Sequence, residues 1–383
     1  MPRFFSEQEY VDRVSRLQKS MQASDIEYLL VTSPEDIFYL SGHHTFGYYT
    51  FQALVVPDSG KPVLIARRGE LVNGRHNSWL STFIPYDDTN DPVEVTTATL
   101  KSFGRQTAKV GVDLDSWFLS PRTYQRITQH LNGFQVVDGG GLIGPLRIIK
   151  SPKEVEYIRE AARIASVGMG AGVEAVRPGA YDHEVAGAIL GAMMSNGCNY
   201  LAVEPVVAVG PRSGNMHSAH DNREIKTGDC VFLEIGGCFN RYHAGLLRTV
   251  YVGPKVPDEV SEWYEITKRV VDHVVSQTRP GATSSDVATT VANVPGVTEE
   301  YKKGRKRVGY SIGIAFAPDW GEGHLMDLKV GDSRPIRPGM TFHVPFAMRR
   351  TDAFGVGFSH TIHVTLNGAE ALTSFPEELF VKP

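Results

Sequence analysis

The sequence lacks the segments and charge patterns that mark membrane and nucleic-acid proteins. Its N-terminal segment, Met1-Pro2-Arg3-Phe4-Phe5-Ser6, turns polar at once, so we expect no secretory signal. No stretch approaches the ~18 apolar residues that a membrane span needs. The 39 basic and 43 acidic residues are interspersed and give a net charge of −4, so no basic stripe indicates a nucleic-acid partner.

Cysteine is also scarce. The chain has three cysteines, Cys198, Cys230 and Cys238, which is an odd number without CxxC spacing. This pattern excludes a disulfide framework and a cysteine zinc site, and it predicts reduced thiols in a cytoplasmic protein. Cys230 and Cys238 lie in apolar, strand-like runs, where we expect them to be buried as small hydrophobic residues.

What the sequence does contain is typical of a globular protein of more than one domain. Its 383 residues predict two or three domains, and 42% hydrophobic with 21% charged residues suffices for sizeable cores. The first part alternates a helical pattern with short apolar runs that predict strands. The predicted helix covers residues 6–21, and the predicted strands cover 28–32, 51–56, 62–65 and 110–112. This alternation favours a layered α/β domain.

A domain boundary is predicted between residues 140 and 152. Gly139-Gly-Gly141 interrupts the pattern, and Ser151 followed by Pro152 and Glu154 is a typical start of a helix. We therefore divide the chain into domains 1–145 and 146–383.

The second domain contains an internal repeat. Arg177-Pro-Gly-Ala180 with Glu184-Val-Ala186 recurs 102 residues later as Arg279-Pro-Gly-Ala282 with Asp286-Val-Ala288. A looser echo relates residues 227–232 to 338–342 and sets Glu234 opposite Pro345. Two copies of a helix-then-strand unit predict an α+β domain with a pseudo-two-fold axis and a site between its halves.

Several ordered motifs resemble the creatinase/aminopeptidase-P superfamily, family M24, whose fold is called pita-bread. They span nearly the whole chain: Asp36-Ile-Phe-Tyr-Leu-Ser-Gly42, Leu146-Arg-Ile-Ile-Lys-Ser-Pro152, Ser213-Gly-Asn-Met-His217, Gly309-Tyr-Ser-Ile-Gly313 and Val364-Thr-Leu-Asn-Gly368. The resemblance implies a creatinase-like α/β N-terminal domain followed by a pita-bread catalytic domain.

The metal ligands of this superfamily are largely missing. Metal-dependent members hold two ions with two Asp, one His and two Glu. By resemblance, the five positions here carry four residues with weak or no ligand atoms and one carboxylate: Glu234, Gly245, Tyr310, Pro345 and Ser359, or His360 one position along. A lone Glu234 does not hold a dinuclear site, so we expect no metal and no cofactor. The cluster of His343, His360 and His363 is a weaker alternative for a single ion.

The chain is most similar to the metal-independent branch, the ectoine hydrolases and creatinase. The similarity lies in residues 232–243 and 309–322. It implies hydrolysis of a C–N bond in a small amidine, guanidino or cyclic-imine compound by a homodimer. His217 corresponds to the acid/base histidine of creatinase, and Glu234 to a carboxylate that contacts the amidine carbon. The alternatives are a surface histidine and a buried carboxylate paired with Arg248 or Arg241.

The remaining candidates are expected to line the pocket. We expect His343 and His360 to join the catalytic group, and eight residues to contact substrate: Phe46, Tyr48, Tyr242, His243, Tyr310, Asp319, Trp320 and Glu322. In this interpretation Trp320 covers an amidinium face and Glu322 holds a substrate ammonium. Packing of these side chains is the competing interpretation, for Phe46 and Tyr48 especially.

Two departures bear on the substrate and the reaction. His360 replaces acids found in ectoine hydrolases, and Met348-Arg-Arg-Thr-Asp352 is unusually basic. Both favour a zwitterionic or anionic substrate with more negative charge than ectoine. A lyase or cyclase reusing the pocket, a protein that only binds, and an Xaa-Pro dipeptidase remain as alternatives.

Overall fold

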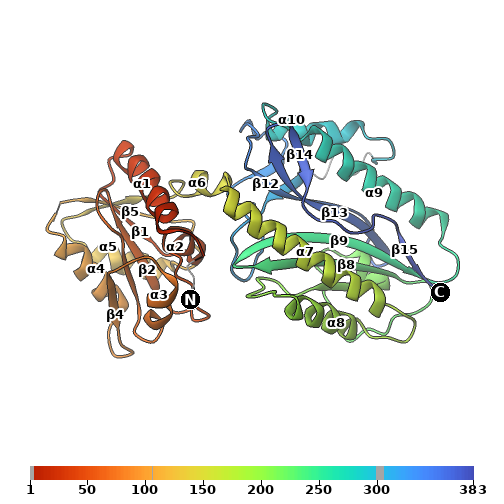
Figure 1. Ribbon diagram of the computed structural model, residues 1–383, viewed down its shortest axis with the longest axis horizontal. Coiled ribbons are helices and arrows are strands. Elements are labelled where there is room, and N and C mark those ends of the chain that lie inside the picture. Colours follow the sequence, from red (N-terminus) through yellow and green to blue (C-terminus); the bar gives the residue numbers. More distant parts are fainter. Residues whose placement is uncertain (1–3, 106, 299–305) are drawn as a thin grey trace. The chain divides into compact units, whose positions relative to one another are not determined.

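The computed structural model describes residues 4–105, 107–298 and 306–383, which form two compact units, Met1–Arg147 and Ile148–Pro383 (Figure 1). The division falls inside the segment where the glycine run and the helix start predict a boundary. No helix in these residues combines the length and apolar character of a membrane span.

The first unit is built on one mixed six-stranded sheet of order β4-β3-β2-β1-β5-β6. β1 pairs antiparallel with β2 and parallel with β5, so an antiparallel half and a parallel half meet at β1. Its strands are β1 (Tyr28–Val31), β2 (Gln52–Pro57), β3 (Val63–Arg67), β4 (Phe83–Tyr86), β5 (Lys109–Val112) and β6 (Gln135–Asp138). Its helices are α1 (Glu7–Ala23), α2 (Pro34–Ser41), α3 (Leu71–Asn77), α4 (Pro92–Ser102) and α5 (Pro121–His130), with α6 (Gly144–Ile148) at the division.

The second unit contains two sheets and two pairs of helices. The sheets have the orders β15-β9-β8-β7 and β11-β10-β12-β13-β14. The strands are β7 (Val206–Val209), β8 (Cys230–Phe239), β9 (Tyr242–Val252), β10 (Arg307–Ser311), β11 (Asp327–Lys329), β12 (Thr341–Arg350), β13 (Phe354–Thr365), β14 (Gly368–Ala371) and β15 (Phe380–Lys382). The helices are α7 (Pro152–Ala175), α8 (Asp182–Ser195), α9 (Asp258–Gln277) and α10 (Ser284–Thr290), with 3-10 turns η1 (Gly210–Gly214) and η2 (Val291–Asn293).

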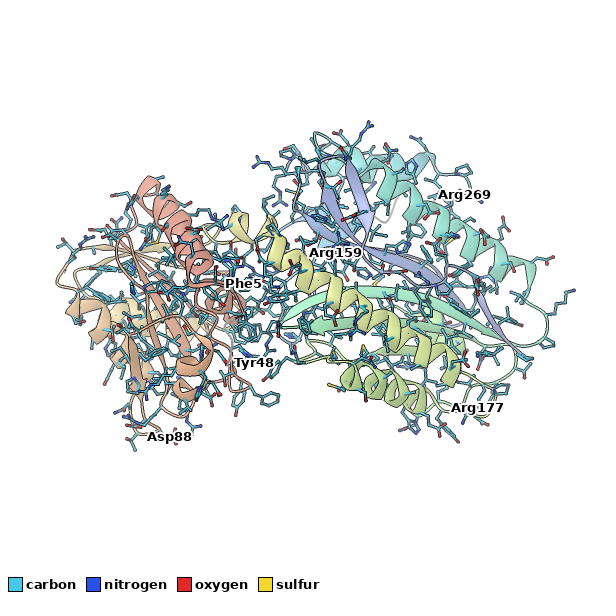
Figure 2. All side chains as sticks on the ribbon, in the orientation of Figure 1. Phe5, Tyr48, Asp88, Arg159, Arg177 and Arg269 are labelled. Carbon is cyan, nitrogen blue, oxygen red and sulfur yellow. The ribbon has the colours of Figure 1, made fainter. Side chains whose placement is uncertain are left out.

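The predicted repeat is a structural repeat. Gly179 N donates to Ile225 O, and Gly281 N donates to Ile336 O, so the two turns bind the segments that precede β8 and β12 in the same way. Both glycines have left-handed backbone angles, φ +81° and +90°. The first turn follows α7, where Figure 2 shows Arg177, and the second follows α9. The domain is therefore two copies of helix, turn, helix and sheet, as the sequence predicted.

The helices cover the outer faces of the two sheets, and the inner faces pack on each other. α7 and α8 share a hydrophobic core with β8 and β9, and α9 shares one with β12 and β13 (Figure 1). Between the sheets, Thr361 Oγ1 donates to Gly245 O at 2.9 Å, and Thr249 Oγ1 donates to Gly357 O at 3.1 Å. Glycines on the inner faces allow this close approach: a Cβ on Gly357 would lie 2.6 Å from the Phe232 ring. The candidate site lies between these faces.

Candidate functional site

Strand alternation places the five positions that the family resemblance assigns to metal ligands around one histidine. Residues on a strand alternate between its faces, so His343 and Pro345 share the inner face of β12. Tyr310 of β10 pairs with His343, and Ser359 of β13 pairs with Pro345. The predicted convergence of these elements in one place is therefore present, with His343 at its centre.

The ring of His343 fills the space next to Gly245, the position that the resemblance assigns to the second acid. A Cβ on Gly245 would lie 2.7 Å from Cε1 and 2.8 Å from Nδ1 and Nε2 of His343. These distances are shorter than van der Waals contact, so no side chain fits at residue 245 while the ring stays in place. The glycine and the histidine are thus complementary: one makes the room that the other occupies.

His343 belongs to a buried chain of hydrogen bonds. Trp320 Nε1 can only donate, and it donates to the Tyr310 hydroxyl at 2.8 Å. That hydroxyl lies 2.8 Å from His343 Nδ1. His343 Nε2 lies 2.9 Å from Ser359 Oγ. In the chain Trp320–Tyr310–His343–Ser359 each ring nitrogen therefore has one hydroxyl partner, and the tautomer of the ring sets which of the two nitrogens donates.

Burial keeps this chain uncharged. It lowers the pKa of His343 to about 3, and the nearby His360 lowers it further. Burial also raises the pKa of Tyr310 well above its usual value, and the negative charge of Glu234 adds to this rise. Glu234, on β8 between Val206 and Leu247, therefore places its charge beside the Tyr310 hydroxyl. At neutral pH the chain is therefore uncharged, and the charges of Glu234, Asp319 and Arg307 act on its Tyr310 hydroxyl.

This set of residues does not fit the two metal ions that the superfamily usually holds. Gly245 and Pro345 offer no side-chain ligand atom. The hydroxyls of Tyr310 and Ser359 are both bonded to His343, whose ring stands where a carboxylate would reach an ion. We therefore derive no step of the chemistry through a metal at this position.

Trp320 and Asp319 form a tight loop before β11. Trp320 is 6% exposed, and its ring covers Gly236, where a Cβ would lie 2.5 Å from Cε3. One face of the indole thus rests on β8, next to Glu234. Asp319 is exposed and accepts from Gly321 N at 2.9 Å, so its carboxylate holds the turn that presents Trp320.

Glu322 is engaged by a lysine of its own chain. Lys150 Nζ lies 2.7 Å from Glu322 Oε2, and both side chains are 1% exposed. Ser311 Oγ donates to the same carboxylate oxygen at 3.1 Å, and Lys150 donates to Ser311 at 3.2 Å. The expected role of Glu322 as the anchor of a substrate ammonium does not agree with this geometry, because the Lys150 ammonium already occupies it.

Tyr242 and His243 are held by the fold and do not line the site. The hydroxyl of Tyr242 donates to Glu154 Oε1 at 2.8 Å and so ties β9 to the start of α7. His243 Nε2 accepts from Ala202 N at 3.2 Å, and Nδ1 donates to Arg241 O at 3.0 Å. Burial lowers the pKa of His243 to about 3. Packing, the competing interpretation, accounts for both residues.

His217 lies in the loop after η1, is exposed, and has a left-handed backbone with φ 56°. Such a conformation costs about 1–2 kcal/mol in a residue with a Cβ. Its side chain makes no hydrogen bond or ion pair with the described residues. The loop is fixed nearby, where Asn215 Nδ2 donates to Asp352 Oδ1 at 2.8 Å. Among the described residues, His217 makes no contact with Glu234.

His360 lies on the other face of β13. It follows Ser359 directly, so its side chain points to the opposite face, near Asp272 of α9, and its Nε2 lies 3.2 Å from Oε1 of Glu377 in the C-terminal segment. Burial lowers the pKa of His360 to about 4. His363 is bonded to Glu370 at 3.0 Å. The three histidines of the predicted cluster thus have separate partners, and the structure does not bring His360 together with His343 in the site.

The basic segment also has other partners. Arg349 donates to Ser213 O at 2.7 Å and to Asn215 O at 2.9 Å, while Arg350 is paired with Glu259. The inference of extra negative charge in the substrate rested on this segment and on His360. Neither feature supports it, because the structure gives both other contacts.

The contacts of Arg248 show whether it forms an ion pair with Glu234. That arginine is fully buried and donates only to backbone carbonyls, those of Leu247, Ser359, Phe375 and Pro376. Pairing of Glu234 with Arg248 is therefore ruled out. Arg241 lies over the rings of Tyr200 and Phe316, at 4.2 and 3.9 Å from their centroids.

The aromatic loop of the first unit is largely exposed. Phe46 is 79% exposed, whereas Tyr48 packs edge-on against Phe118 with 5.9 Å between ring centroids. The Phe46 ring is therefore open to solvent, whereas the Tyr48 ring is packed within its own unit. A role of either in binding substrate stays a prediction.

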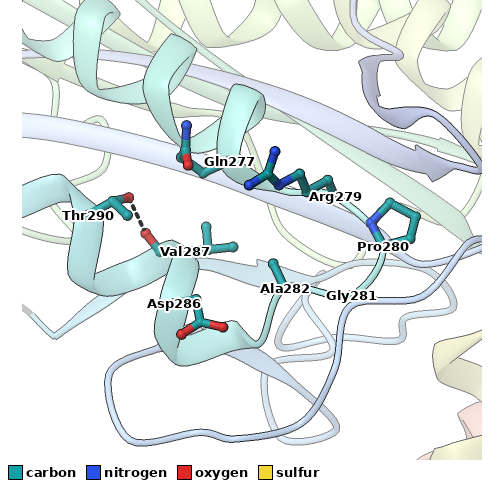
Figure 3. A pocket seen from close by; sticks show the side chains of 8 residues that line it. All are labelled: Gln277, Arg279, Pro280, Gly281, Ala282, Asp286, Val287 and Thr290. Carbon is teal, nitrogen blue, oxygen red and sulfur yellow. Dashed lines mark hydrogen bonds between the residues drawn. The ribbon is translucent and has the colours of Figure 1, made fainter.

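A surface pocket of about 430 Å³ lies beside the second copy of the repeated turn (Figure 3). It is lined by Gln277, Arg279, Pro280, Gly281, Ala282, Asp286, Val287 and Thr290. None of the candidate residues is among them, so we do not assign the site to this pocket.

Sequence reasoning missed Lys150, Ser311 and the part that Ser359 plays. No motif links Lys150 to Glu322, which are 172 residues apart. Ser359 was recognised only as a lost ligand. Its bond to His343 follows from the hairpin register that sets Ser359 opposite Pro345, a signal that strand alternation could have given.

Two family models match the chain. Metallopeptidase family M24 matches residues 156–366, and the creatinase/prolidase N-terminal domain matches residues 13–149. Ectoine hydrolase of Halomonas elongata is 28% identical over 99% of this chain and 98% of its own length. An uncharacterized hydrolase/peptidase of Sinorhizobium fredii is 31% identical over 99% and 98%. The crystal structure of a prolidase from Thermococcus sibiricus superposes with a TM-score of 0.85 at 23% identity, covering 98% and 100% of the two chains.

Proposed function

Since the chain belongs to metallopeptidase family M24 and is a hydrolase of that family, we propose that it hydrolyses a non-peptide C–N bond in a small amidine, guanidino or cyclic-imine compound without a metal ion. The observation that carries the proposal is the ring of His343 packed against Gly245, the position at which the family resemblance leads us to expect the second metal-ligating acid. If the neutral chain Trp320–Tyr310–His343–Ser359 occupies the place of the metal ions, the transition state needs another source of electrostatic stabilisation. An amidine or guanidinium substrate supplies positive charge itself.

Glu234 is the residue to which we assign the central role. Its negative charge acts on the Tyr310 hydroxyl, and the indole of Trp320, which donates to that hydroxyl, packs on Gly236 two residues further along β8. A cationic planar carbon next to a carboxylate and an aromatic ring is stabilised by both. Glu234 then either attacks that carbon or orients the attacking water.

His217 is the proposed proton donor to the leaving nitrogen. Its ring is exposed and has both nitrogens available among the described residues, and its strained backbone is of the kind found at functional loops. In this proposal the loop brings His217 to Glu234 when substrate binds.

The likeness to ectoine hydrolase supports a small zwitterionic substrate with an amidine-type carbon. Arg349, Arg350 and His360 have partners of their own, which removes the reason to expect a more anionic compound. Ectoine is therefore the first compound to test, followed by related cyclic amidines, creatine and other guanidino acids.

The experiment is turnover of this panel by the purified protein, with mass spectrometry of the products formed in oxygen-18 water. We expect one oxygen-18 atom per C–N bond broken, and a loss of at least a hundredfold in kcat in Glu234→Gln and His217→Ala. Glu204→Gln is the matched control, since Glu204 is an exposed acid of the same unit, and it should leave turnover unchanged. Product without oxygen-18 would instead identify a lyase or cyclase.

Xaa-Pro dipeptidase activity is the second candidate, because the T. sibiricus prolidase shares the fold. The loss of ligand atoms at Gly245 and Pro345 argues against it. Cleavage of Xaa-Pro peptides in the presence of manganese would overturn the metal-free proposal.

A further inference from the structure

A second group of metal-ligating side chains lies on the outer face of β13, where the strand packs on α9. Asp272 of α9, His360 of β13 and Glu377 of the C-terminal segment offer ligand atoms that all lie within 4.8 Å of one another. We propose that this group binds one divalent transition-metal ion of the Zn²⁺ type, and that the ion cross-links the C-terminal segment to α9 and β13.

The ligands have the chemistry of a zinc site. One imidazole and two carboxylates are common protein ligands of Zn²⁺, and three such ligands leave a position for water. His360 is 5% exposed, Glu377 is half-buried and Asp272 is exposed. The group is therefore anchored in the interior and open to an incoming ion from the solvent.

The ring of His360 is held in the orientation that a ligand needs. Its Nδ1 lies 3.0 Å from Thr373 Oγ1, and its Nε2 points to Glu377. A hydroxyl can donate or accept, so Thr373 supports the tautomer that leaves Nε2 free for an ion. Outer partners of this kind commonly orient metal-bound histidines.

The two carboxylates of the group share one nearby ammonium, that of Lys268, whose positive charge also acts on Asp272. Lys268 Nζ lies 3.0 Å from Glu377 Oε2 and neutralises that acid. The Asp272 side chain makes no hydrogen bond or ion pair within the described residues, although it approaches Glu377 and the ring of His360. Two carboxylates so close repel each other, and a divalent cation between them removes the repulsion.

Binding would strengthen an existing attachment. Arg248 already holds the carbonyls of Phe375 and Pro376, and the Tyr264 hydroxyl lies 3.3 and 3.0 Å from the carbonyls of Glu377 and Glu378. An ion that binds only the folded chain raises the melting temperature by mass action.

The test is calorimetric titration of chelator-treated full-length protein with Zn²⁺, together with its melting temperature. We expect one equivalent to bind and the melting temperature to rise. Asp272→Asn and His360→Ala should each weaken binding at least tenfold, whereas Lys268→Met should strengthen it because Glu377 loses its competing partner. His183→Ala, which removes an exposed histidine of the same unit, is the control and should bind like the wild type.

Three outcomes overturn the proposal. Wild-type protein that binds no Zn²⁺ is the first, and equal binding by Asp272→Asn and His183→Ala is the second. Asp272 is exposed, so Asp272→Asn keeps the fold even if His360→Ala does not. The third is binding that Asp272→Asn retains and His343→Gln abolishes, which would place the ion between the sheets and count against metal-free catalysis. The first two outcomes would refute the zinc site but would not affect the proposed hydrolysis.

Discussion

At the scale of single residues, the site depends on side chains that fit one another. Glycine at 245 and histidine at 343 share one volume, and the hydroxyls of Tyr310 and Ser359 satisfy both nitrogens of that histidine. A buried polar group is costly unless it is hydrogen-bonded, so the four members of the chain depend on one another.

Tyr310→Phe tests this dependence. The change removes one oxygen and leaves the Trp320 Nε1 proton and His343 Nδ1 without their partner inside the fold. We expect a loss of about 1–3 kcal/mol in the free energy of unfolding, the cost of buried unsatisfied groups. Urea denaturation measures it, with Tyr49→Phe as the control because Tyr49 is 77% exposed. Equal stability of the two variants would show that the chain does not hold the site together.

Residue identities could be predicted better than residue partners. The sequence expectation that Tyr310, Pro345 and Ser359 stand at ligand positions stays a prediction, although their places on neighbouring strands bring them near His343. The sequence could not indicate that Lys150 neutralises Glu322, because a contact across 172 residues leaves no local pattern. His243 looked like a pocket residue and is instead bonded to two backbone groups. Those bonds depend on where loops pass, which residue type alone does not determine.

At the scale of elements, the repeated turn explains why the domain has two halves. Ala180 N donates to Arg177 O, and Ala282 N donates to Arg279 O, in turns whose glycines lie in the left-handed region. The sequence showed this repeat because the turn requires glycine at a defined position. The face of the sheet on which a strand residue lies was harder to predict, because a shift of one residue moves a side chain to the other face. That is why His360 was expected in the site and lies against α9.

Gly179→Ala and Gly281→Ala test the equivalence of the two turns. A Cβ at either position meets no atom within 4 Å, so the cost is conformational alone. Each variant should lose about 1–2 kcal/mol in unfolding free energy, the cost of a left-handed residue with a Cβ. Gly187→Ala, at an exposed position inside α8, should instead gain about 0.5–1 kcal/mol. Unequal losses at the two turns would contradict their equivalence. Thermal denaturation of the three variants provides the measurement.

At the scale of the whole molecule, buried neutral histidines couple stability to pH. In the second unit, burial lowers the pKa of His243 and His343 to about 3 and that of His360 to about 4. An unfolded histidine has a pKa of about 6.5. Below pH 6.5 these histidines bind protons in the unfolded chain but stay neutral in the folded protein. The free energy of unfolding therefore decreases as the pH falls.

His343→Gln isolates one of these contributions. Between about pH 6.5 and pH 3, each such histidine reduces the unfolding free energy by up to about 1.4 kcal/mol per pH unit as the pH decreases. The variant should therefore show a flatter dependence of stability on pH than the wild type, whatever its stability at pH 7.5. Urea unfolding at pH 7.5, 6.0 and 5.0 gives the slopes. His183→Gln should keep the wild-type slope, and the same slope in His343→Gln would show that the ring titrates in the folded protein.

The two units and the doubled architecture of the second were predictable because they rest on glycine turns, helix caps and motifs along the chain. The chemistry of the site was harder to predict, because it depends on which charged side chains pair with one another in the folded protein.

The most direct test of the central claim is turnover of ectoine and related amidines by protein treated with chelator, its metal content verified by elemental analysis. The account predicts the same rate before and after chelation, no gain with manganese, and no cleavage of Xaa-Pro peptides. Loss of activity on chelation and its return with manganese would contradict it.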